Sequence, residues 1–136
     1  MHTLTRPALT LALLAAAALL GGCATPPAPP APATGLAEIM ERPAERALLD
    51  GIRAYDDGQY AQAETALRTA LGAGLKSARD RATAHKLLAF ITCTSNRLAD
   101  CESQFREARA ADAAFALSRS ESGHPVWGPV YRSVTQ

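Results

Sequence analysis

Beyond residue 35, apolar residues recur at the spacing of three and four that marks one face of an α-helix. The pattern predicts four main helices, over residues 45–57, 60–71, 80–95 and 99–111, after a short apolar face at Leu36, Ile39 and Met40. Asp80 is placed to cap the third helix. No segment alternates apolar and polar residues as a half-buried strand does. The fold class is therefore predicted to be all-α.

Small, aromatic and glycine residues surround the turn between the first two predicted helices. In order they are Gly51, Tyr55, Gly58, Tyr60, Ala63, Leu67, Ala70 and Leu71. Small residues at Gly51 and Ala63 let two helices approach closely, and Gly58 suits a tight turn. This segment resembles a tetratricopeptide repeat, which is a pair of helices joined by a turn.

A second unit follows in the same register, 38 residues along the chain, against about 34 in the tetratricopeptide family. Its members are His85, Leu88, Ala89, Asn96, Leu98, Cys101, Phe105 and Ala108. Asn96 replaces the turn glycine, Cys101 replaces the packing alanine, and the surplus residues fit a linker at 72–77. The resemblance implies about two tetratricopeptide-like hairpins. A generic alanine-rich helical bundle is the alternative.

The end of the chain is expected to cap this stack, because two repeats alone leave one apolar face open. Apolar residues recur there at helical spacing, at Val126, Trp127, Val130, Tyr131 and Val134. Pro129 suits the first turn of such a helix. His124, Trp127 and Tyr131 thus mark a C-terminal capping segment. Trp127, the only tryptophan, is either an anchor in the core or a partner-binding hot spot.

Residues 1–22 have the character of an export signal. A lone basic residue, Arg6, precedes an apolar run from Leu9 to Leu20 and two small residues. The run is shorter than the about 20 residues that a membrane-spanning helix needs. Leu20-Gly21-Gly22-Cys23 resembles the lipobox of bacterial lipoproteins, which implies lipid attachment at Cys23 and cleavage before it. The alternative is an ordinary signal peptide that ends near a cysteine.

Residues 23–35 then read as a lipidated cysteine with a proline-rich tether, and residues 36–136 as the helical domain. Closely spaced prolines favour an extended chain, which would reach about 30–40 Å from the membrane. Ala24 stands where an inner-membrane retention signal usually carries aspartate. By resemblance to enterobacterial sorting rules, we expect an outer-membrane lipid anchor and a domain that faces the periplasm.

The mature chain is balanced in charge, because the signal removes one of 14 basic residues and leaves 13 acidic ones. This balance provides no electrostatic reason to expect nucleic-acid binding. His85 and His124 are too isolated to suggest a metal site, and no catalytic triad, phosphate loop or distinctive carboxylate pair occurs. We expect a non-enzymatic protein without a cofactor, a metal or a small-molecule substrate.

Cys93 and Cys101 lie on opposite sides of the second predicted turn. Repeat geometry puts one late in a helix and the other early in the next, so a disulfide there would staple the hairpin. Export to an oxidising compartment favours this pairing. Two separately buried thiols are the alternative, and two ligands are too few for a zinc site.

The first helix of each hairpin lines the concave surface of a repeat stack. The side chains expected there, as a peptide-binding groove, are those of Leu48, Ile52, Tyr55, Lys86 and Phe90. A basic patch is expected nearby, at Lys76, Arg79, Arg81, His85 and Lys86. Such patches are often only solvated faces.

Four features together resemble the tetratricopeptide lipoproteins of type VI secretion clusters, the TssQ-like family. They are the lipobox, the proline-rich tether, residues 84–93 with Cys101 and Phe105-Arg106, and the closing segment 123–131. The resemblance covers residues 45–131 and implies an accessory protein that binds a protein partner near the secretion machine's membrane complex. A general envelope-assembly lipoprotein, serving outer-membrane protein insertion or pilus biogenesis, is the alternative.

Overall fold

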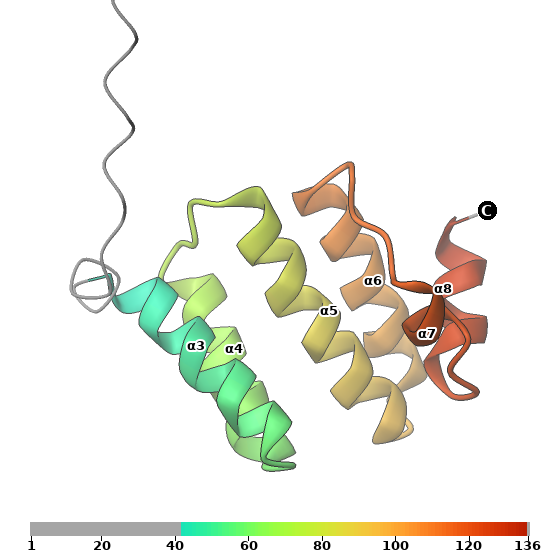
Figure 1. Cartoon of the computed structure of the whole chain (residues 1–136), viewed down its shortest axis with the longest axis horizontal. Helices are drawn as coiled ribbons and strands as arrows, with labels where there is room; N and C mark the ends of the chain where they lie inside the picture. The colour runs from blue at the N-terminus through green and yellow to red at the C-terminus, as the bar shows by residue number, and fades with distance from the viewer. Residues whose placement is uncertain (1–41, 136) are drawn as a thin grey trace, which may run out of the picture. The chain divides into compact units, whose positions relative to one another are not determined.

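Six α-helices make up residues 42–135, the part of the chain that the computed structural model describes (Figure 1). They are α3 (Pro43–Asp56), α4 (Tyr60–Gly72), α5 (Ala78–Thr94), α6 (Leu98–Ala111), α7 (Arg119–Ser122) and α8 (Trp127–Thr135). No strand occurs within these residues, so the all-α prediction is confirmed. The predicted signal peptide, Cys23, the tether and the apolar face at residues 36–40 lie outside the described residues.

The four longer helices form two antiparallel hairpins, α3 with α4 and α5 with α6 (Figure 1). The hairpins pack side by side, mainly through α4 and α5, and α8 lies against α6 at the far end of the stack. This is the predicted arrangement of two tetratricopeptide-like hairpins with a C-terminal capping helix. The sequence pattern does not predict α7, because a helix of four residues is too short to show a period.

The two hairpins turn in the same way, at positions 38 residues apart. Gly58 and Asn96 have φ angles of 73° and 59°, in the left-handed region that glycine and asparagine tolerate best. In both turns the backbone N–H of the following residue donates to the carbonyl oxygen five residues before it. Gln59 donates to Ala54 at 2.7 Å in the first turn, and Arg97 donates to Thr92 at 2.8 Å in the second. The matching geometry confirms the predicted register and the use of Asn96 as a turn residue.

The hairpin interiors follow the same register. On the second helix of each hairpin, the side chains at 0 % exposure are Ala63, Leu67 and Ala70 in α4 and Cys101, Phe105 and Ala108 in α6. A Cβ at Gly51 would lie 2.8 Å from Cγ of Leu67, closer than carbon atoms pack, so α3 and α4 meet at a distance that only glycine allows. Ala89 takes the equivalent place in the second hairpin.

The start of α5 differs from the prediction. Ser77 is the residue that caps the helix, since its hydroxyl accepts a hydrogen bond from the backbone N–H of Asp80 at 3.2 Å. Asp80 itself falls in the first turn, where an acidic side chain is favourable. The prediction that Asp80 caps this helix is therefore wrong, because the serine three residues earlier makes the standard capping bond.

Candidate functional site: a cleft between α3 and α5

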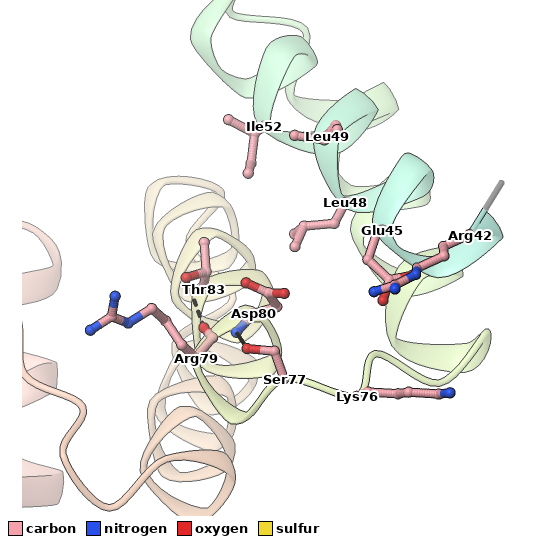
Figure 2. A pocket seen from close by; sticks show the side chains of 10 residues that line it. All are labelled: Arg42, Glu45, Leu48, Leu49, Ile52, Lys76, Ser77, Arg79, Asp80 and Thr83. Atoms are coloured by element: carbon pink, nitrogen blue, oxygen red, sulfur yellow. Dashed lines mark hydrogen bonds between the residues drawn. The ribbon is translucent and has the colours of Figure 1, made fainter. Parts of the chain in front are cut away.

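A cleft of about 560 Å³ lies between α3 and the first turns of α5 (Figure 2). We call it the α3 cleft. Its apolar lining comes from one face of α3, at Leu48, Leu49 and Ile52. Its polar lining is Arg42, Glu45, Lys76, Ser77, Arg79, Asp80 and Thr83. The site is thus an aliphatic floor, one helix face wide, with charged side chains at its edge.

The loop before α5 holds the basic edge of the α3 cleft in place. The guanidinium of Arg81 donates to the carbonyl oxygens of Leu75 at 3.0 Å and Lys76 at 2.7 Å. Ser77, which follows Lys76 in this loop, is held by the hydrogen bond that its hydroxyl accepts from the backbone N–H of Asp80. Lys76 and Arg79 form no ion pair with any residue in the 42–135 range. Their charges are therefore available to an acidic group that enters the cleft.

The five residues predicted to form one groove do not form one site. Leu48 and Ile52 line the α3 cleft, whereas Tyr55, Lys86 and Phe90 do not. Phe90 is only 4 % exposed, because the ring of Trp127 stacks on it with centroids 4.2 Å apart. The C-terminal segment therefore covers the second-hairpin half of the predicted groove.

Lys86 and Tyr55 are likewise engaged within the domain. The ammonium of Lys86 donates to a carboxylate oxygen of Glu121 at 2.7 Å. Burial raises the pKa of Glu121, but the bonds from Lys86 and Ser118 outweigh burial and lower that pKa overall. The ring of Tyr55 packs against Tyr60 with centroids 5.5 Å apart. Burial, followed by electrostatic interaction with Tyr60, Asp56 and Glu121, raises the pKa of Tyr55.

The predicted basic patch is also divided. Lys76 and Arg79 border the α3 cleft, but Arg81 binds backbone carbonyls and Lys86 is paired with Glu121. The ring of His85 shares a hydrogen bond of 2.8 Å with the side-chain oxygen of Gln104. These side chains are close in sequence, but they contact different partners and do not form one patch.

Trp127 and Tyr131 lie where a capping segment must lie. Trp127 donates from Nε1 to the carbonyl of Glu121 at 2.8 Å, and the ring of His124 stacks on the indole with centroids 3.3 Å apart. The ring of Tyr131 meets Phe105 edge to face at 5.3 Å. Both rings are half-buried and pack against the core cluster. The structure thus places them as contacts between α8 and the α5·α6 hairpin.

Cys93 and Cys101 form a disulfide across the second turn, with Cα atoms 5.0 Å apart. The bond joins the end of α5 to the start of α6, at the positions that Tyr55 and Ala63 occupy in the first hairpin. Both half-cystines are buried, at 2 % and 0 % exposure. A buried disulfide indicates that the domain works in an oxidising, extracytoplasmic compartment.

Glu64 links the two hairpins. Its carboxylate accepts two hydrogen bonds from the guanidinium of Arg97, at 3.0 and 2.6 Å, and two from Arg68 on its own helix. These bonds, above all those from Arg97, lower the pKa of Glu64 to about 2 against the opposing effect of burial. The pair sets how α4 sits beside the turn that leads into α6, and so contributes to the shape of the stack.

The described part of the chain holds no group of three metal-ligating side chains. None of the helices between residues 42 and 135 is long and apolar enough to cross a membrane. The cleft residues that sequence reasoning missed are chiefly Leu49, Glu45 and Thr83. The signal for Leu49 was available, because it lies on the same predicted apolar face as Leu48 and Ile52.

The described residues therefore define an all-α domain of paired helices, closed by a C-terminal helix and stapled by one disulfide. No known protein family, curated protein or solved structure matches the chain.

Proposed function

We propose that this protein is a lipid-anchored, non-enzymatic adaptor of the bacterial outer membrane that binds a protein partner in the α3 cleft. The cleft is the observation that carries the proposal. Leu48, Leu49 and Ile52 are spaced along one face of α3, and such a stripe suits the apolar face of an amphipathic segment. The charged side chains at the edge of the cleft would set the orientation of that segment.

The proposed setting is the type VI secretion system, in which the protein would serve as an accessory near the membrane complex. The resemblance to TssQ-like lipoproteins in residues 84–93 and 123–131 supports this setting, as does the paired-helix domain. The lipobox-like sequence at Cys23 supports the anchor, and the disulfide agrees with export. A general envelope-assembly lipoprotein remains the competing hypothesis.

Co-purification from bacterial envelopes tests the adaptor proposal with two matched variants. Leu49→Glu places a charge on the floor of the α3 cleft, whereas Leu98→Glu makes the same change at a side chain that is 52 % exposed at the start of α6. We expect Leu49→Glu to lose type VI membrane-complex components and Leu98→Glu to keep them, with both variants folded by circular dichroism. Equal recovery with both variants would refute the cleft as the binding site. Components of outer-membrane insertion or pilus biogenesis, recovered instead, would favour the competing hypothesis.

Membrane fractionation tests the anchor separately. Cys23→Ser removes the sulfur to which lipid would be attached, so we expect the variant to leave the membrane fraction. An unchanged distribution would contradict the lipoprotein assignment, whatever the cleft binds.

A further inference from the structure

The α3 cleft opens where the chain enters α3. Arg42, the residue immediately before the helix, lines the cleft. The residues that precede Arg42 therefore begin at the edge of the cleft. From Arg42 to Ile52 the cleft follows α3 for about 15 Å, at 1.5 Å of rise per residue. A helix of six residues is about 9 Å long, so residues 36–41, if folded back from Arg42, would reach along α3 to the level of Leu48.

Residues 36–41, which lie outside the described residues, have a composition that complements the α3 cleft. Their sequence is Leu-Ala-Glu-Ile-Met-Glu. Leu36, Ile39 and Met40 share one face at helical spacing, and Glu38 and Glu41 supply two negative charges. Covering such an apolar face with another surface is favourable, because it removes aliphatic side chains from water.

The charges at the edge of the cleft also fit. Lys76 and Arg79 have no ion-pair partner among residues 42–135, although Glu45 and Asp80 add negative charge nearby. With Arg42 the edge carries one more basic than acidic side chain. An acidic, aliphatic segment therefore matches the cleft better than a basic one.

We propose that residues 36–41 dock in the α3 cleft, with Leu36, Ile39 and Met40 on its aliphatic floor and Glu38 and Glu41 toward Lys76 and Arg79. The segment is joined to the cleft at Arg42, so its effective concentration is in the millimolar range or above and weak contacts suffice for docking. If the proposed adaptor function is correct, on which this second step rests, a partner enters the cleft by displacing residues 36–41. Binding of the partner would then depend on how firmly this segment is docked.

A thiol-bridging experiment on the full-length lipoprotein tests the docking without any partner. Ile39→Cys is combined with Thr83→Cys, whose side chain lines the α5 wall of the cleft (Figure 2). The control combines Ala37→Cys with Thr83→Cys, since residue 37 lies off the apolar face. After mild oxidation, peptide mapping identifies the bridges, and the buried Cys93–Cys101 bond provides an internal reference.

We expect an intramolecular bridge with Ile39→Cys at severalfold higher yield than with Ala37→Cys. Adding Leu36→Asp should lower that yield on the order of tenfold, the effect of losing one buried aliphatic side chain. Equal yields from the two pairs, or bridges only between two chains, would overturn the proposal, the latter result assigning the cleft to a second copy.

The partner arm separates this proposal from the adaptor proposal. Leu36→Asp alone should increase co-purification of the envelope partner severalfold if the segment competes for the cleft. Unchanged co-purification in a variant that has lost its bridge would overturn the competition. Loss of the partner from wild-type protein as well would count against the adaptor function and leave the bridging result standing. A bridge from an introduced thiol to Cys23 would reveal a free thiol there and contradict lipid attachment.

Discussion

Replacing Gly51 by alanine tests the close approach of α3 and α4. In an unconstrained helix this change stabilises by about 0.8–1.0 kcal/mol, because alanine has the higher helix propensity. Here the new Cβ would lie 2.8 Å from Cγ and 2.9 Å from Cδ2 of Leu67, and 3.2 Å from the backbone nitrogen of that residue. Leu67 is 0 % exposed and has no free space to enter, so the two helices must move apart.

Overpacking of this kind costs about 1–3 kcal/mol. The clash therefore outweighs the gain in propensity, and we expect Gly51→Ala to lower the free energy of unfolding by about 1 kcal/mol. In a domain of this size the midpoint of thermal unfolding would fall by about 4–8 °C. Urea unfolding followed by far-ultraviolet circular dichroism measures the same difference at constant temperature.

Gly72→Ala is the matched control. Gly72 lies in the last turn of α4, and a Cβ there would have no neighbour within 4 Å. The control should gain up to about 0.5–1 kcal/mol from propensity alone. Opposite signs for the two variants would support the close approach. If Gly51→Ala stabilised the domain as much as Gly72→Ala does, the tight α3·α4 contact would be refuted.

Three further predictions concern the stability of the stack. The lowered pKa of Glu64 implies a contribution to stability that is present above about pH 4.5 and is lost as the pH falls toward 2. Because Arg97 is partly exposed and solvent screens the pair, this contribution is about 1 kcal/mol. Glu64→Gln should flatten that part of a curve of unfolding free energy against pH. Cys93 and Cys101 should resist thiol labelling without reductant, and replacing both by serine should cost about 2.5 kcal/mol for a loop of this length; free thiols would contradict the bond. Trp127→Ala should lower stability by about 2 kcal/mol, and a variant of unchanged stability that loses its partner would instead identify a binding hot spot.

Most of the fold could be predicted because its determinants are local. Helical spacing, the turn residues Gly58 and Asn96, and the small residues Gly51 and Ala63 each act within one hairpin. Because the second hairpin repeats the pattern of the first, equivalent positions in the two hairpins can be assigned from the sequence alone. The cap of α5 was missed by three residues, because Ser77 and Asp80 are both good N-terminal residues and only the backbone geometry distinguishes their roles.

The groove could not be predicted in full because its second half depends on a long-range contact. Nothing in the spacing of Phe90 indicates that Trp127, far along the chain, stacks on its ring. Nothing in the sequence likewise indicates that Lys86 pairs with Glu121, so the sequence alone suggests a solvent-exposed base. The capping segment was expected at the end of the stack, but the face that it also covers becomes visible only in three dimensions.

The difference between the two hairpins also indicates which end of the domain is free to bind. Ile52 and Phe90 hold equivalent positions 38 residues apart. Phe90 is covered by Trp127, whereas Ile52 borders an open cleft of about 560 Å³. Within residues 42–135, the C-terminal segment therefore covers this position in the second hairpin, whereas the equivalent position in the first hairpin borders the cleft. Because the chain enters α3 at Arg42 beside that open face, any ligand of the cleft must bind next to the N-terminal end of α3.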